Sequence, residues 1–201
     1  DLFEALKELL RKVRAEDALL DQADWESFRE RSVVLTQRTL DLYSEMGKFR
    51  PDFYVPRRDW DGEESTYNRF LASDRTLLAI SGVQGTGKSA LAAHIASRSV
   101  EEGHAVLFVN AQRFTFADVE WSGTPYPKYF SDLLHYTCPF DKTAISRIIK
   151  TGEDKGKKVI LFIDAVNEVD GLTKKWNRFI AMELLLNWIS DIAQPGLKVV
   201  V

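Results

Sequence analysis

The chain has few of the residues that cross-link or anchor a protein. Its 201 residues include one cysteine, Cys138, which excludes an intramolecular disulfide and a metal site built from several thiolates of this chain. No apolar run approaches the roughly 20 residues that a helix needs to span a bilayer, and the start, DLFEALKELLRK, alternates charge with leucine instead of forming a signal-peptide core. We therefore expect a protein of the reducing cytoplasm without membrane contact.

An excess of positive charge is also absent. Because 27 Lys and Arg face 30 Asp and Glu, the net charge of −3 gives no general attraction to a nucleic-acid backbone. Short basic clusters such as Arg57-Arg58 are typical of exposed helix faces and loop ends. Nucleic acid is therefore a disfavoured partner.

Hydrophobic spacing at the start of the chain predicts helices. Apolar residues from Leu2 to Val13 and from Trp25 to Met46 recur at steps of three and four residues, which indicates two amphipathic helices. Two prolines then predict an extended linker over Phe49–Asp61, and a short helix is expected over Glu63–Ala72. The segment 1–50 either packs on the rest of the chain or serves as an oligomerisation or effector surface.

From residue 76 the hydrophobic period alternates between strand and helix. The expected strands are Thr76–Ser81, Ala105–Asn110, Lys158–Asp164 and Leu197–Val201. The expected helices are Ser89–Glu101, Tyr126–Tyr136, Thr143–Lys150 and Arg178–Ile192. This alternation indicates an α/β fold with a parallel sheet flanked by helices. We expect a helical segment (1–50), a linker with a short helix (51–75) and an α/β core (76–201) that is incomplete at its C-terminus, as in a piece of a longer protein.

The clearest chemical pattern is an eight-residue stretch: Gly82, Val83, Gln84, Gly85, Thr86, Gly87, Lys88 and Ser89. It matches the phosphate-binding P-loop, G-x4-G-K-[S/T], and lies after an expected strand and before an expected helix, as that loop requires. Glycines let backbone N–H groups approach phosphate oxygens, and the helix start adds its dipole. We expect these residues and the adjacent Ala90 to bind a nucleoside triphosphate, with Lys88 on the β- and γ-phosphates and Ser89 on Mg²⁺.

A carboxylate for the metal is expected at the end of another strand. In KVILFIDAVNE, five apolar residues lead to Asp164, which is predicted to bind Mg²⁺ at the carboxyl end of the sheet. In the loop that follows, Glu168 can accept a proton from the attacking water, whereas Asn167 can only orient it. The predicted catalytic residues are therefore Lys88, Asp164 and Glu168.

These motifs, with the terminal LKVVV, resemble the STAND class of signal-transduction ATPases and, within it, the NACHT group. Ala165 matches the small residue that this group places after the metal-binding Asp, and Glu168 matches the second member of its acidic pair. Asn167 departs from the first member, which leaves weak or regulated hydrolysis possible. The resemblance covers about Phe53–Val201. It implies a P-loop NTPase sheet in which the strand Leu197–Val201 lies between the strand before Gly82 and the strand that ends at Asp164.

The same resemblance implies ligands and partners. Tyr54, Pro56 and Arg57 would lie beside the adenine, and Arg113 is a candidate phosphate sensor. ATP and ADP, with Mg²⁺, would control homo-oligomerisation of the full-length protein, and effector or ligand partners would bind through domains outside this chain. Hydrolysis would reset the switch.

Other uses of the same loop remain open. A small-molecule kinase is disfavoured because Trp121–Lys150 contains only Arg147 where such kinases carry an arginine-rich lid. An AAA+ ATPase would commonly have Glu at the position of Ala165, and a GTPase would carry Asn-Lys-x-Asp, which is absent. A module that binds nucleotide without turnover is a further alternative.

Overall fold

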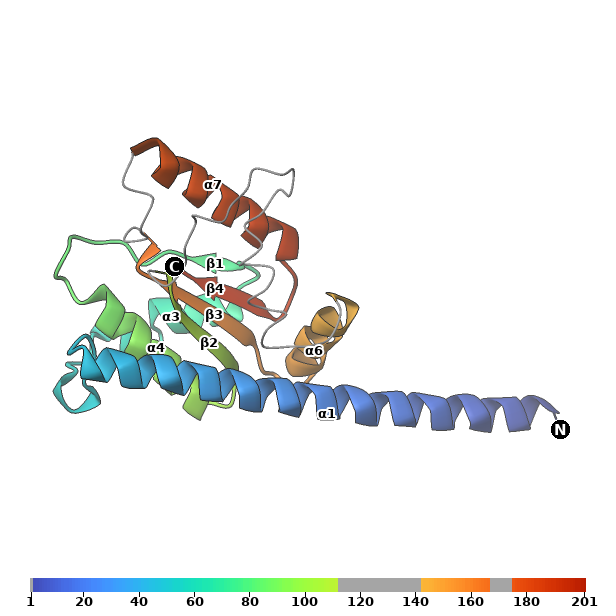
Figure 1. Ribbon diagram of the computed structural model, residues 1–201. Coiled ribbons are helices and arrows are strands. Elements are labelled where there is room, and N and C mark those ends of the chain that lie inside the picture. The colour runs from blue at the N-terminus through green and yellow to red at the C-terminus, as the bar shows by residue number, and fades with distance from the viewer. Residues whose placement is uncertain (1, 112–141, 167–174) are drawn as a thin grey trace.

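The computed structural model describes residues 2–111, 142–166 and 175–201. Four parallel strands form its sheet in the spatial order β1-β4-β3-β2 (Figure 1): β1 (Leu77–Leu78), β2 (Ala105–Asn110), β3 (Val159–Asp164) and β4 (Leu197–Val200). The helices beside it are α1 (Leu2–Glu45), α2 (Arg58–Asp61), α3 (Thr66–Ala72), α4 (Lys88–Glu101), α6 (Lys142–Asp154) and α7 (Lys175–Ile192), with a short 3-10 turn η1 (Pro51–Phe53). The described residues therefore form an α/β fold with helices flanking a parallel sheet.

Three strands match their predicted limits to within one residue: β2, β3 and β4. Their residues are buried on both faces, so the apolar runs that identify them are long and unbroken. The first strand is shorter than the predicted Thr76–Ser81, although Thr76 and Ile80 still form backbone hydrogen bonds with Val199 and Val201. β4 lies between β1 and β3, the position that the family resemblance implied, so that prediction is confirmed. The predicted helix Tyr126–Tyr136 lies outside the described residues.

The N-terminal segment forms one helix, so the prediction of two helices was wrong. α1 runs without a break from Leu2 to Glu45. The stretch between the two predicted helices, RAEDALLDQAD, contains no Gly or Pro, and its three Ala and two Leu residues favour helix. A gap in apolar spacing changes which face is apolar, but without a helix-breaking residue it does not end the helix.

The end of α1 has a specific backbone motif. Gly47 adopts a left-handed conformation (φ 67°), and its N–H bonds to the Ser44 carbonyl while the Lys48 N–H bonds to the Tyr43 carbonyl at 2.8 Å. These two bonds are those of a Schellman motif, which satisfies the last carbonyls of a helix and turns the chain sharply. The turn fixes where Tyr43 and Lys48 lie relative to the sheet.

The sheet has two apolar faces, as the alternation of side chains in its strands requires. One face carries Leu107, Leu161 and Val199 and packs against α6 and α7. The other carries Phe108 and Phe162 and packs against α3 and α4. Each face has its own buried cluster, so both sides of every central strand are covered.

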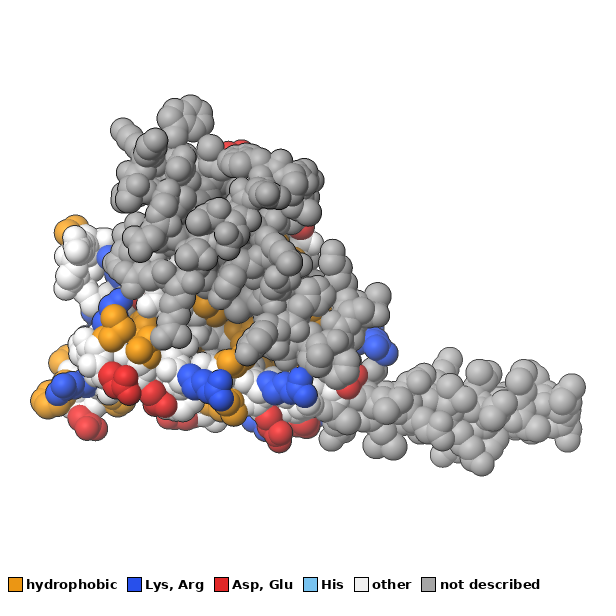
Figure 2. Space-filling model, viewed as in Figure 1, with side chains coloured by type: hydrophobic (Ala, Val, Ile, Leu, Met, Phe, Trp, Pro, Cys, Tyr) orange, Lys and Arg blue, Asp and Glu red, His pale blue; other side chains and the backbone are white. Residues whose placement is uncertain are grey.

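α1 lies across the edge strand β2 and joins both clusters (Figure 1). Trp25 and Phe28 are buried in one cluster and Tyr43 in the other. Between them, Thr36 meets the strand edge, where its hydroxyl donates to the Val106 carbonyl and accepts from the Phe108 N–H. The helix thereby satisfies backbone groups that an open sheet edge leaves unpaired. Charged side chains of both signs are interspersed along its described outer side (Figure 2).

The connection between α1 and the sheet departs in part from its prediction. Phe49–Asp61 was expected to be extended, but η1 and α2 lie within it. η1 begins at Pro51, and proline fits the first position of such a turn, whereas α2 begins two residues after Pro56. The expected short helix is present as α3, where the Ser65 hydroxyl caps the helix by accepting from the Asn68 N–H at 3.1 Å. Of the helices in the described ranges, none is long and apolar enough to cross a bilayer.

A buried histidine predicts that acid weakens the fold. The Nδ1 atom of His104 accepts from the Lys158 N–H at 3.0 Å, and burial, with the charges of Lys157 and Lys158, lowers the pKa of His104 from 6.5 to about 4. Between these two pKa values the unfolded chain binds a proton that the folded chain does not. The contribution of neutral His104 to the free energy of unfolding is therefore fully present above the unfolded pKa and decreases as the pH falls below it. Urea unfolding at a pH of about 5.5 should give a free energy of unfolding roughly 1 kcal/mol below that at about 7.5.

The matched control for this prediction is His104→Asn, which keeps an acceptor but does not titrate. Its free energy of unfolding should vary less between the two pH values than that of the wild type. Equal pH dependence in the two proteins would show that groups other than His104 are responsible.

Candidate functional site

The predicted phosphate-binding residues, Gly82–Ser89, run from the exposed loop after β1 into the first turn of α4, and we call this segment the glycine loop. Gly85 (φ 83°) and Gly87 (φ 76°, ψ 31°) are both left-handed, a conformation that glycine adopts without strain. Gly87 is also the residue at which α4 begins, and no side chain caps that helix end. The first N–H groups of a helix have no partner within the helix, so this end suits an anion.

Neighbouring side chains leave little room for a Cβ atom at two of the glycines in the loop. A Cβ atom at Gly87 would lie 2.7 Å from Nη2 of Arg57, and one at Gly82 would lie 3.1 Å from Oγ1 of Thr86. The Arg57 guanidinium donates to the Thr86 carbonyl at 2.8 Å. Arg57, which we predicted to lie beside the base, therefore braces the outside of the glycine loop.

The Lys88 side chain bonds to backbone carbonyls of the glycine loop. Its Nζ donates to the carbonyls of Gly82 at 2.9 Å and Val83 at 3.1 Å, and the Thr86 hydroxyl donates to the same Val83 carbonyl at 2.8 Å. Bonds from an ammonium group to neutral carbonyls are weaker than bonds to phosphate oxygens. A phosphate group in the loop would therefore be the preferred partner of Lys88.

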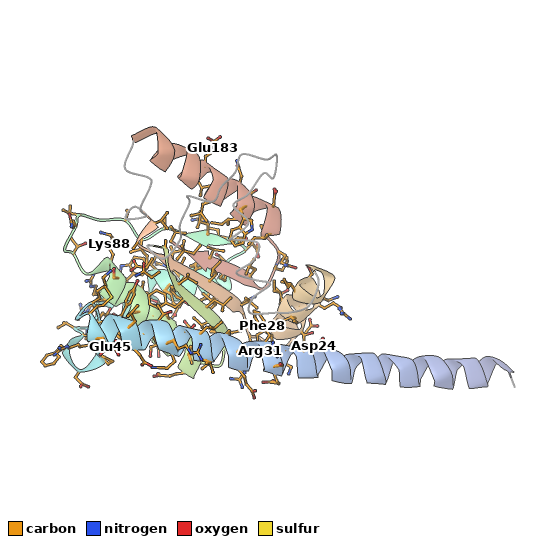
Figure 3. All side chains as sticks on the ribbon, in the orientation of Figure 1. Asp24, Phe28, Arg31, Glu45, Lys88 and Glu183 are labelled. Atoms are coloured by element: carbon orange, nitrogen blue, oxygen red, sulfur yellow. The ribbon has the colours of Figure 1, made fainter. Side chains whose placement is uncertain are left out.

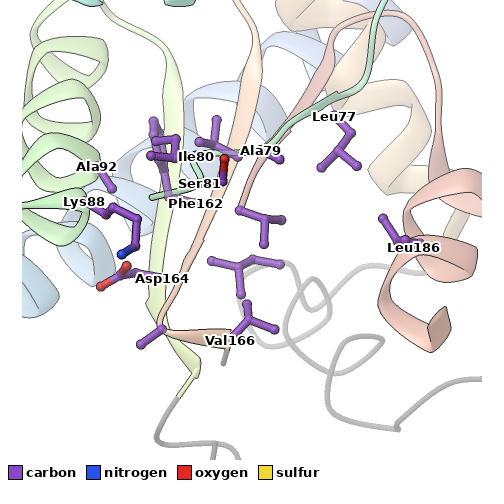
Figure 4. A pocket seen from close by; sticks show the side chains of 14 residues that line it. Leu77, Ala79, Ile80, Ser81, Lys88, Ala92, Phe162, Asp164, Val166 and Leu186 are labelled. Carbon is purple, nitrogen blue, oxygen red and sulfur yellow. The ribbon is translucent and has the colours of Figure 1, made fainter. Parts of the chain in front are cut away.

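Asp164 reaches the same hollow from the end of β3. The glycine loop and Asp164 line a polar cavity of about 840 Å³ together with Lys48 from the turn after α1 and residues from the segment after β1 and the start of α4. The residues lining it are Lys48, Ile80, Ser81, Gly82, Gln84, Gly85, Gly87, Lys88, Ser89, Ala90, Asp164 and Ala165. Figure 4 shows the ends of the Lys88 and Asp164 side chains in the same small space. The sheet thus brings together residues that the sequence analysis had predicted for one site.

A residue that the sequence analysis missed also reaches Asp164. The hydroxyl of Tyr43, near the end of α1, donates to Oδ2 of Asp164 at 2.7 Å. Tyr43 is fully buried, and 121 positions separate it from its acceptor. No local pattern could have found this contact, because an aromatic residue at a helical apolar position is ordinary core.

The residue after Asp164 has an unusual backbone. Ala165 is buried and has φ 62°, which makes it the one described non-glycine residue with positive φ. A left-handed conformation costs an L-residue about 1–2 kcal/mol, so the surrounding structure must hold it in place. The turn at Ala165 directs the chain away from β3 immediately beyond the carboxylate. A small side chain fits there, in agreement with the position of Ala165 in the predicted motif.

The oxygen donors in this hollow fit Mg²⁺ better than a softer metal. Ser89 and Asp164 supply a hydroxyl and a carboxylate, and Mg²⁺ is commonly held by one or two such groups together with substrate phosphates and water. Among the described residues, no group of three or more His, Cys, Asp or Glu could hold a metal ion. The donor set therefore fits a cation that is bound jointly with a phosphate.

A second cavity of about 630 Å³ lies beside the first and shares Lys48 and Ala90 with it. Its walls include Tyr54, Pro56 and Arg57, the three residues predicted to lie near the base. An open space next to the first turn of α4 is compatible with a planar ring attached to phosphates in the glycine loop.

An aspartate holds one wall of this second cavity against α4. Asp61 accepts from the hydroxyl of Tyr54 at 3.1 Å and from the Arg57 N–H, and one of its oxygens lies 3.1 Å from Nε2 of His94. The Tyr54 ring stacks on the His94 ring at 3.9 Å with 15° between their planes. Burial and the charge of Asp61 raise the pKa of Tyr54 to about 12. The predicted linker is thus fixed to the helix that follows the glycine loop.

A third, mostly apolar cavity of about 250 Å³ lies between the strand ends and α7 (Figure 4). Lys88 and Asp164 are at its edge, and Leu186 of α7 is on its far side.

Three predicted residues cannot be compared with this geometry, because Glu168, Asn167 and Arg113 lie outside the described residues. The position of the proposed water-orienting base therefore stays a prediction.

Comparison of the chain with models of protein families, with curated proteins and with solved structures gives no significant match. The function must therefore be argued from the residues and the geometry above.

Proposed function

We propose that this chain binds a nucleoside triphosphate, with Mg²⁺, through a P-loop NTPase fold and hydrolyses it slowly. The observation that carries the proposal is the convergence of two separate elements on one polar hollow. The glycine loop follows β1, Asp164 ends β3, and β4 lies between the two strands. A simple tight turn would need neither the Lys88-Ser89 pair nor a carboxylate at the facing strand end.

Each residue of the hollow has a definite chemical role in this proposal. Backbone N–H groups of the glycine loop and the start of α4 bind the phosphate oxygens. Lys88 exchanges its carbonyl partners for the β- and γ-phosphates, while Ser89 and Asp164 hold Mg²⁺. The bound cation supplies neutralisation of the charge that develops on the phosphates. The predicted role of Glu168 is to accept a proton from the attacking water.

The base would occupy the neighbouring cavity, against Tyr54 and Pro56. The fixed Tyr54 ring offers an apolar face, and Lys48 lies where the two cavities meet. Preference for ATP over GTP is argued from the family resemblance and from the absence of an Asn-Lys-x-Asp motif in the sequence.

We further propose that the chain is the nucleotide switch domain of a cytoplasmic STAND protein of the NACHT type. ATP and ADP differ by a γ-phosphate, which can shift a population between two forms only if one form binds it better. In the full-length protein the ATP form would assemble into a homo-oligomer, and domains outside this chain would bind ligands and effectors. The order of strands in the sheet supports the proposal, because the resemblance to this class implies a strand between β1 and β3, where β4 lies.

The test is calorimetric titration of the chain with ATP, ADP and GTP, each with and without Mg²⁺. Saturable binding that favours adenine nucleotides, followed by slow phosphate release without any added acceptor, is the expected result. Phosphate release that required a small-molecule acceptor would favour a kinase, and binding without release would favour a non-hydrolysing module. A folded chain that binds none of the nucleotides would contradict the proposal.

A further inference from the structure

We infer that the C-terminal end of α1 belongs to the metal side of this site, where Tyr43 is a positioning residue for Asp164. The inference rests on the proposed nucleotide function and deepens it. It assigns a role to the N-terminal helix, for which the sequence analysis left packing and partner contact as alternatives. Figure 3 shows the end of α1, at Glu45, on the same side of the molecule as Lys88, whereas Asp24 lies far along the helix.

The position of the Tyr43 hydroxyl is fixed from several directions. The ring is fully buried and meets Phe108 edge to face, with centroids 5.1 Å apart. Nζ of Lys48 lies 5.4 Å from the centroid of the same ring. The Tyr43 carbonyl accepts the N–H groups of Lys48 and Phe49 in the turn that ends α1. Since both the backbone and the ring of Tyr43 are held in place, rotation of the Asp164 carboxylate would break its hydrogen bond with the Tyr43 hydroxyl.

This contact orients the carboxylate without blocking it. A carboxylate has about four lone-pair sites on its two oxygens, and the bond from Tyr43 uses one of them on Oδ2. The remaining sites stay available to a cation in the hollow. Outer partners of this kind fix the orientation of metal ligands, and their loss commonly lowers metal affinity by about 10- to 100-fold.

A carboxylate that is oriented through α1 connects the helix to the cation. Whatever strengthens cation binding at Asp164 through this bond must, by thermodynamic linkage, strengthen the docking of the α1 end by the same factor. The nucleotide then has a physical route to the N-terminal helix, which crosses the sheet edge and shares both buried clusters.

The experiment compares Tyr43→Phe with Tyr67→Phe. Both substitutions remove one buried phenolic hydroxyl from the same cluster, but the hydroxyl of Tyr67 bonds to Ser99 at 2.8 Å and not to the site. ATP affinity is measured by calorimetry in EDTA and at saturating Mg²⁺. We expect Tyr43→Phe to reduce the gain in ATP affinity from Mg²⁺ by about 10-fold, while its affinity in EDTA stays within about 2-fold of the wild type. Tyr67→Phe should keep the whole gain.

A third variant separates action through Asp164 from a general loosening of the core. If Tyr43 acts through the carboxylate, adding Tyr43→Phe to Asp164→Asn should cause no further loss of the Mg²⁺ effect. A full Mg²⁺ gain in Tyr43→Phe, an equal loss in Tyr67→Phe, or an additive double variant would each overturn the inference while leaving nucleotide binding established. Absence of ATP binding in the wild type would instead overturn the proposed function, and this inference with it.

Discussion

Lys88→Ala should strongly weaken nucleotide binding, with the affinity for ATP and ADP falling by at least about 30-fold. Lys88 is the cation at the centre of the glycine loop, and Nζ already lies on the carbonyls of Gly82 and Val83 that surround the expected phosphate position. Its removal leaves the phosphates with only backbone N–H groups and the bound cation as partners. Truncating one member of a close charge pair costs about 2–5 kcal/mol, which exceeds what the remaining contacts can recover.

The control for this substitution is Lys155→Ala. Lys155 lies outside the loop and its Nζ pairs with Glu26 at 3.2 Å, so the variant loses the same side chain without touching the hollow. Calorimetric titration of both variants with ATP, with thermal unfolding to confirm that each is folded, gives the comparison. Retention of wild-type affinity in Lys88→Ala would show that the glycine loop does not hold the phosphates.

Gly152→Ala should destabilise the chain by about 3 kcal/mol, which is opposite in sign to the usual effect of this change within a helix. A Cβ atom at Gly152 of α6 would lie 2.3 Å from Cζ3 and 2.6 Å from Cη2 of Trp25. The indole is 1% exposed and packed in the cluster that joins α1 to the sheet, so it has no room to retreat. The helices must move apart, and the contacts between α1 and α6 are lost.

A double-mutant cycle with Trp25→Leu tests whether the indole is the cause. Trp25→Leu alone should destabilise the chain because it leaves a cavity, but in the Gly152→Ala background it should cost at least about 1 kcal/mol less. Urea unfolding of the four proteins gives the coupling energy. Additive effects, or a stabilising Gly152→Ala, would show that the two helices are less tightly packed than the structure indicates.

Local chemistry determined those parts of the fold and site that the sequence analysis predicted correctly. β2 and β3 are buried on both faces, so their apolar runs were visible in the sequence without knowledge of their partners. The glycine loop could be predicted because its left-handed glycines, Lys88 and Ser89 are consecutive. Asp164 followed from its place at the end of a strand, since parallel strands end at one edge of a sheet.

Errors arose where a local pattern has more than one tertiary outcome. The gap in apolar spacing near the middle of α1 predicted the end of a helix, but the helix continues because it contains no Gly or Pro between Leu2 and Glu45. Arg57 lines the cavity proposed for the base, and the contact of its guanidinium with the Thr86 carbonyl was not predicted. A long side chain can reach several groups, and only the folded backbone decides which of them it meets.

The sequence by itself determined the α/β class, three of the four strands, and the glycine loop and Asp164 that line the hollow. Only the tertiary structure decided that α1 covers the edge of β2 through Thr36, and that Tyr43 reaches the carboxylate of Asp164. These contacts join residues 70 and 121 positions apart. In the sequence, Thr36 and Tyr43 are ordinary residues on one side of a helix, because a contact between distant segments depends on how their surfaces pack and leaves no periodic signal in either segment.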